Sequence, residues 1–185
     1  TILDVSTFAN VNLGLSQDIE SSPSLWALAD ISPEALDIAL IKNNVIEFSR
    51  NLNWSKPKIK DAYSKESSDS AQLESLSTEI TKTLIDKLQQ ALSSCRSIEG
   101  NELVGHIFLT GGGVLNPYIV QELEKETEVS TTALKPPEPV NTLESSPSSL
   151  TLTSLSLGLR EIKKQNIETN LLPKNLQPKR KKVNL

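Results

Sequence analysis

Length, composition and charge already restrict what this chain does. It has 185 residues, a formal net charge of -4, one Cys, one His and 4% aromatic residues. A single Cys and a single His exclude a disulfide framework, a Cys-rich zinc site and His-cluster metal sites. The acidic balance and the scarcity of aromatic side chains argue against nucleic acid as a partner. The sequence contains no Met, so we expect it to be a piece of a longer protein.

The first fifty residues predict a helix followed by an antiparallel meander. Apolar residues recur at the spacing of a helical turn within residues 4–15, namely at Val5, Phe8, Val11 and Leu15. Short apolar runs then predict strands over residues 25–30, 36–41 and 45–50. Asn43 and Asn44 predict a tight turn between the last two strands, because Asn tolerates a positive φ.

The rest of the chain predicts alternating helices and strands. A long amphipathic helix is predicted over about residues 69–95, and another over residues 150–164. Between them, residues 105–110 predict a buried strand. Asn116 and Pro117 predict the start of a helix that ends near Glu126, because Pro is favoured at the first helical position. The next segment, 129–133, predicts an edge strand.

The sharpest local feature is Thr110-Gly111-Gly112-Gly113, which lies between a predicted strand and a predicted helix. One interpretation is a nucleotide contact, since glycines allow close approach of the backbone and a helix start supplies amide donors. The other is a tight turn in which Gly provides a positive φ. The triplet alone leaves both open.

Other single residues have a functional and a structural interpretation. Asp30 ends a predicted buried strand, where a carboxylate can hold magnesium near phosphates, or can merely cap Ser32 or a neighbouring amide. His106 lies in an apolar run and predicts a satisfied core or edge histidine. Cys95 predicts a small buried hydrophobe.

The tail carries an apolar cluster and then a basic cluster. Asn170-Leu171-Leu172-Pro173 interrupts a polar stretch and predicts either a docking motif or packing back onto the domain. The basic residues that follow are a solvated tail or a juxtamembrane stretch before a span beyond the last residue, Leu185. They include Lys179, Arg180, Lys181 and Lys182. No apolar run in the chain approaches the roughly 18–20 residues of a membrane-spanning helix.

The order of these elements resembles the second half of the actin-like PilM family of type IV pilus assembly proteins, whose relatives are FtsA and the cytoplasmic part of GspL. The resemblance rests on three motifs: Leu3-Asp4-Val5-Ser6-Thr7-Phe8-Ala9-Asn10, Leu109-Thr110-Gly111-Gly112-Gly113 and Leu155-Ser156-Leu157-Gly158-Leu159-Arg160. It implies an α/β, actin-like (ribonuclease H-like) ATPase fold with a mixed sheet flanked by helices over residues 1–164. It also implies a reduced helical insert over about residues 53–100.

The tail adds a second resemblance. Asn170-Leu171-Leu172-Pro173-Lys174 is similar to the N-terminal peptide of PilN, the inner-membrane partner of PilM. This implies a PilN-like segment over residues 165–185, from a natural or engineered fusion, with Asn170 to Pro173 as partner-binding residues. The implied partners are PilN/PilO-like or GspM-like inner-membrane proteins, a motor ATPase and a second copy of the chain. The implied location is the cytoplasmic face of a bacterial inner membrane, reached through a lost C-terminal span.

The chain departs from the family at the phosphate-binding hairpin. The family motif reads D-I-G, whereas this chain has Asp30-Ile31-Ser32 followed by Pro33, which lacks an N–H. Asp37, if it lay about 4 Å from a phosphate, would repel it by about 4 kcal/mol at an effective dielectric constant near 20. The resemblance implies Asp30 and Gly111 to Gly113 as cofactor-binding residues. The departures nevertheless favour no bound cofactor in this chain, and they leave ATP and magnesium as an open alternative for the full-length parent protein.

Three functions compete on these grounds. The favoured one is a non-catalytic scaffold of a type IV pilus or type II secretion platform that links a membrane protein to a motor, with no catalytic residue. The alternative is the ATP-binding half of an active actin-like ATPase. The third is a sugar-kinase-like enzyme, which is disfavoured because this chain shows no catalytic Asp in a D-x-G-like context.

Overall fold

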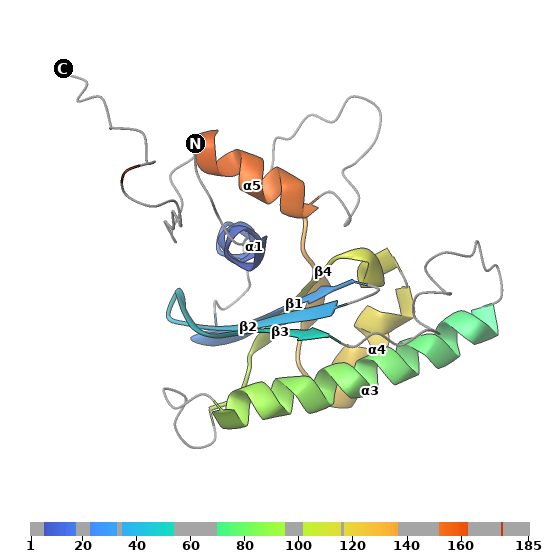
Figure 1. Cartoon of the computed structure of the whole chain (residues 1–185). Helices are drawn as coiled ribbons and strands as arrows, with labels where there is room; N and C mark the ends of the chain where they lie inside the picture. Colours follow the sequence, from blue (N-terminus) through green and yellow to red (C-terminus); the bar gives the residue numbers. More distant parts are fainter. Residues whose placement is uncertain are drawn as a thin grey trace.

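The fold is a mixed five-stranded sheet with helices on both faces (Figure 1). The computed structural model describes residues 6–17, 23–32, 35–53, 70–94, 102–115, 117–136 and 152–162, together with residue 175. The elements are α1 (Ser6–Gly14), β1 (Leu25–Ile31), β2 (Ala35–Lys42), β3 (Val45–Asn53), α3 (Ser70–Ser94), β4 (His106–Thr110), η1 (Gly112–Leu115), α4 (Pro117–Thr127), β5 (Thr131–Ala133) and α5 (Leu152–Ile162). The strands lie in the order β3-β2-β1-β4-β5.

The predicted meander is confirmed. Strands β1, β2 and β3 pair antiparallel in sequence, and Asn43 and Asn44 have φ values of 50° and 65° in the turn between β2 and β3. Two positive φ values in a two-residue turn match the right-handed twist of the flanking strands. Strand β4 then pairs parallel with β1, and β5 parallel with β4, so the sheet is mixed.

An irregularity in β3 distributes its side chains between the two faces of the sheet. The register between β2 and β3 shifts between Leu40 and Ile41. Because a one-residue shift reverses the facing of every later side chain, Ile46 packs against the α1 face and Phe48 against the α3 face.

One face of the sheet is covered by α3 and α4. The apolar stripe predicted for α3 is buried where its side chains are described, with Ile80 and Leu84 0% exposed and Leu88 5% exposed. These side chains pack against the inward residues of β1, β2 and β4, such as Ala29 and Ile38. This layer forms the larger of the two apolar clusters.

The opposite face is covered by α1, and α5 lies over α1 (Figure 1). Trp26 and Phe108 meet here with ring centroids 5.5 Å apart, and a Cβ at Gly14 would lie 2.9 Å from Trp26 Cη2. The buried surface of α1 extends beyond the single apolar face that the sequence predicts. Asn10 and Asn12 are also buried, because α5 covers the side of α1 that faces away from the sheet.

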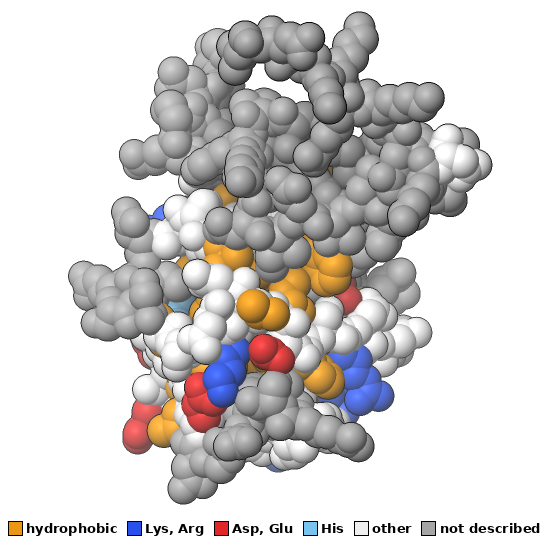
Figure 2. Space-filling model, turned by 90° about the vertical axis from the view of Figure 1, so that its left-hand side faces the viewer, with side chains coloured by type: hydrophobic (Ala, Val, Ile, Leu, Met, Phe, Trp, Pro, Cys, Tyr) orange, Lys and Arg blue, Asp and Glu red, His pale blue; other side chains and the backbone are white. Residues whose placement is uncertain are grey.

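Charged and apolar side chains lie close together at the β2–β3 turn end of the sheet. Lys42 Nζ donates to Glu102 Oε2 at 2.6 Å, and both side chains are 24% exposed. Figure 2 shows one face of the molecule, where hydrophobic side chains gather and oppositely charged side chains lie next to one another below them.

Among the described helices, none is long and apolar enough to cross a bilayer.

Candidate nucleotide-type site

A polar row crosses four strands at one end of the sheet, on the α1 face. Asp30 on β1 pairs with Asp37 on β2 and with Thr110 on β4, and Asp37 pairs with Asn51 on β3. Asn51 Nδ2 donates to Asp37 Oδ1 at 2.7 Å. The row lies at the carboxyl ends of the parallel strands β1 and β4, which is where ligands bind in open α/β sheets.

Asp30 is the centre of a hydrogen-bond network that joins three elements. Asn10 Nδ2 on α1 donates to Asp30 Oδ2 at 3.1 Å and to Thr153 Oγ1 on α5 at 3.0 Å. The Thr153 hydroxyl also lowers the pKa of the Asp30 carboxyl by hydrogen bonding. The Asp30 carboxylate is therefore bonded to α1, while the caps expected from the sequence, on Ser32 or a neighbouring amide, stay predictions.

The environment of Asp30 disfavours its charge. Burial, and next the negative charge of Asp37, raise the pKa of Asp30, while hydrogen bonding from Thr153 lowers it, and the net result is a rise from 3.8 to about 6. A carboxyl group with this pKa is charged at neutral pH at a cost in free energy. A cation beside Asp30 would remove that cost.

Two buried oxygens next to Asp30 lack partners within the described residues. They are Asn10 Oδ1 and Thr110 Oγ1. Together with the Asp30 carboxylate they are hard oxygen donors, the kind that magnesium prefers. No group of three or more His, Cys, Asp or Glu side chains forms a metal cage in the described ranges. The residues present therefore fit a magnesium ion that takes its other ligands from water or phosphate.

Gly111 closes tightly on Asp30. It has a φ of 83°, and a Cβ at this position would fall against Asp30 Oδ1 and 2.5 Å from the Ile31 carbonyl oxygen. The other two glycines have a different role, because Gly112 and Gly113 begin the short 3₁₀-helix η1. Only the first glycine of the triplet has the positive φ that the turn interpretation expected.

The β1–β2 hairpin is closed by its own hydrogen bonds. Ser32 N donates to the Ala35 carbonyl oxygen at 3.0 Å, and Ala35 N donates to Ser32 Oγ at 3.0 Å. The Ser32 hydroxyl also donates to the Ala35 carbonyl oxygen at 2.8 Å. Two backbone donors of the hairpin are thus engaged inside it.

His106 has a structural role, as predicted. It is buried, its Nε2 lies 2.9 Å from Thr132 Oγ1, and its ring packs against Phe108 at 4.6 Å between centroids. Burial lowers the pKa of His106, while nearby Glu124 opposes this. The imidazole is therefore neutral at physiological pH and stabilises the β4–β5 pair.

Several predicted residues lie outside the described residues. They are Cys95, the docking residues Asn170, Leu171, Leu172 and Pro173, and the basic residues Lys179, Arg180, Lys181 and Lys182. Sequence reasoning in turn missed Asn10 and Thr153, which complete the network around Asp30. An Asn between apolar neighbours in a short helix was the available signal for Asn10.

Comparison with known proteins identifies the fold. No protein-family model matches the sequence, and no curated protein is similar to it in sequence. A PilM–PilN type IV pilus biogenesis complex matches with a TM-score of 0.58 and 19% identity, over 88% of this chain and 53% of that one. MreB5 of Spiroplasma citri bound to AMPPNP matches with a TM-score of 0.55 and 13% identity, over 83% of this chain and 58% of that one. The chain has the actin-like fold, as predicted, and spans just over half the length of these structures.

Proposed function

We propose that this chain is part of a non-catalytic scaffold at the cytoplasmic face of a bacterial inner membrane. It would link a membrane protein to the motor of a type IV pilus or type II secretion platform. The actin-like fold and the likeness to the PilM–PilN complex support this class of function. The observation that carries it is the closed β1–β2 hairpin.

A loop that cradles phosphate presents free backbone N–H groups to it. In this hairpin the N–H groups of Ser32 and Ala35 are engaged with each other's residue, and Pro33 has none. Asp37 adds a negative charge two strands' width from Gly111, in register with Asp30. The hairpin is therefore poorly suited to hold a nucleotide's phosphates, and a structural role follows.

The second candidate is ATP binding in a longer protein that contains this chain. The observation in its favour is the grouping of Asp30, Thr110 and Gly111, with two buried oxygens that lack a partner in the described part of the chain. Magnesium held there would supply positive charge to the phosphates. Asp30 would hold the ion, directly or through water, and the tight turn at Gly111 would let the backbone approach the nucleotide.

Calorimetry with an ATP analogue and magnesium, on the longest protein that carries this sequence, tests the two candidates. The scaffold predicts no binding heat, and it predicts that Ser32→Gly with Pro33→Ala gains binding by freeing and adding N–H donors. Adding Asp30→Asn to that variant should remove the gain. Clear binding by the unaltered protein would make the ATP-binding candidate the better one.

We further propose that the domain covers residues 1–164 and that residues 165–185 form a PilN-like docking tail. Burial of Leu171 and Leu172 would contribute about 1.5–3 kcal/mol each before ordering costs. This energy is enough for docking when the covalent link raises the effective concentration of the tail peptide to about the millimolar range. Leu171→Ala with Leu172→Ala should leave the thermal unfolding midpoint unchanged and abolish capture of the tail peptide by the complete actin-like domain. Undiminished capture would remove the docking role.

A further inference from the structure

The outer edge of β3 is open in the part of the chain that the structure describes. Among the described strands, β3 lies at the end of the sheet and has β2 as its single neighbour. It runs over nine residues, Val45–Asn53, which is longer than the usual strand of about five or six. An edge strand of this length presents backbone donors and acceptors to another extended chain.

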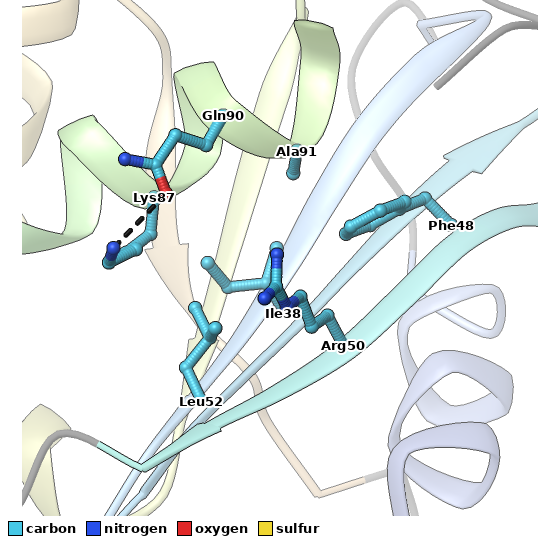
Figure 3. A pocket seen from close by; sticks show the side chains of 7 residues that line it. All are labelled: Ile38, Phe48, Arg50, Leu52, Lys87, Gln90 and Ala91. Carbon is cyan, nitrogen blue, oxygen red and sulfur yellow. Dashed lines mark hydrogen bonds between the residues drawn. The ribbon is translucent and has the colours of Figure 1, made fainter. Parts of the chain in front are cut away.

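A groove runs alongside this edge, between β3 and α3 (Figure 3). Seven residues line it: Ile38, Phe48, Arg50, Leu52, Lys87, Gln90 and Ala91. Its floor is apolar, because Ile38 is 1% exposed and Ala91 is 3% exposed. Phe48 and Leu52 are half-buried against the same core. An apolar side chain placed in the groove would cover both.

The polar groups of the groove are cationic. Arg50 lies between Phe48 and Leu52 on the α3 face of β3, and it pairs across the ladder with Ile38. Lys87 approaches from α3, with its Nζ donating to Gln90 Oε1 at 3.1 Å. None of the described side chains that line the groove is acidic. Within the described residues Arg50 forms no ion pair, although the chain as a whole has a net charge of -4.

We propose that an acidic, extended peptide from another protein binds here as an additional strand on β3. Alternate residues of a strand face the same side, so the peptide would place three side chains toward α3. The peptide side chains that complement Phe48, Arg50 and Leu52 are apolar, acidic and apolar in that order. The peptide class is therefore an extended segment of the form apolar-x-Asp/Glu-x-apolar.

Charge complementarity selects this occupant over the chain's own tail. The end of the chain carries Lys179, Arg180, Lys181 and Lys182, which Arg50 and Lys87 would repel. The groove also lies on the α3 face, opposite the face that holds the polar row with Asp30. Peptide binding at β3 is thus independent of the proposed scaffold function and of nucleotide binding.

Peptide binding by fluorescence anisotropy tests the proposal with the full chain in low salt. The probe is Ser-Val-Ser-Glu-Ser-Val-Ser with a rhodamine label, and the matched probe has Lys in place of Glu. We expect the Glu peptide to bind at least about tenfold more tightly than the Lys peptide, because two cations contribute. Arg50→Glu with Lys87→Glu should reverse this preference. Lys82→Glu with Lys125→Glu, an equal charge change at exposed positions away from the groove, should keep it.

Amide hydrogen exchange identifies the binding edge. The Glu peptide should slow exchange of the outward-facing amides of β3 and leave β4 unchanged. Equal binding of both peptides, no slowing in β3, or an equal loss in the control variant would overturn the proposal. A dimer of the unaltered chain that Arg50→Glu with Lys87→Glu dissociates would overturn it too, because a second copy would then be the occupant. If that variant does not fold, Arg50→Gln with Lys87→Gln decides, and undiminished binding by it refutes the proposal.

Discussion

Replacing Asp30 by Asn should stabilise this protein at neutral pH. The pKa of Asp30 is raised from 3.8 to about 6 by burial and by Asp37. A raised pKa means that the folded state binds the proton more tightly than the unfolded state does. The contribution of Asp30 to the free energy of unfolding is therefore highest below pH 3.8 and falls as the pH rises through about 6. With about 1.4 kcal/mol per pKa unit, the charged carboxylate costs on the order of 3 kcal/mol above pH 6.

An Asn at position 30 has the shape of the neutral carboxyl group and lacks its pH dependence. Urea unfolding should show Asp30→Asn more stable than the unaltered chain by up to about 3 kcal/mol at pH 8 and equal to it at pH 3.5. Asp86→Asn, at an exposed carboxylate on α3, is the matched control and should change stability by less than about 0.5 kcal/mol at either pH. A difference for Asp30→Asn that is the same at both pH values would refute the reasoning.

Three further substitutions test the packing around the site and in the core. Gly111→Ala should lower the free energy of unfolding by about 2 kcal/mol or more, because the new Cβ would meet Asp30 and Ile31. Gly158→Ala is the control and should raise the free energy of unfolding by about 0.5–1 kcal/mol, because no described atom lies within 4 Å of the new Cβ. Equal effects of the two substitutions in thermal unfolding would contradict this. Thr110→Val removes a buried hydroxyl that has no hydrogen-bond partner among the described residues, and it should be neutral or stabilising by about 1 kcal/mol in urea, so a loss would show that this hydroxyl has a partner. Leu84→Ala should lower the free energy of unfolding by about 3–5 kcal/mol, because Leu84 is 0% exposed. Lys82→Ala, at an exposed position on the same helix, should change it by close to zero. If Leu84→Ala shifts the unfolding midpoint no more than Lys82→Ala does, the packing of α3 against the core is refuted.

Periodicity in the sequence predicted the elements well because each depends on neighbours close in the chain. The Asn43-Asn44 turn and the stripe at Ile80, Leu84 and Leu88 are local patterns, and both are confirmed. The bulge opposite Leu40 and Ile41 was not predicted, because it depends on how β3 packs against two different helical layers.

Of the residues around Asp30, the sequence predicts those whose position depends on local pattern and misses those brought in by long-range contacts. Asp30 and Gly111 each follow an apolar run, so their strand-end positions could be read from the sequence. Asn10 and Thr153 are separated by 143 residues, and no spacing rule relates them. The burial of α1 on nearly all sides likewise requires α5, which the amphipathic interpretation of α1 alone did not include.

The placement of α5 over α1 has a consequence for synthesis. Asn10 and Thr153 are 143 residues apart, so at about 5–20 residues per second the cover of α1 emerges roughly 7–30 s after α1 itself. The fully buried residues of the α3-side cluster are all made once residue 123 is, whereas those of the α1-side cluster wait for Leu134 and Leu152. We therefore expect the nascent chain to order from the α3 side first. Until α5 is made, the α1 side chains that α5 covers stay exposed to solvent.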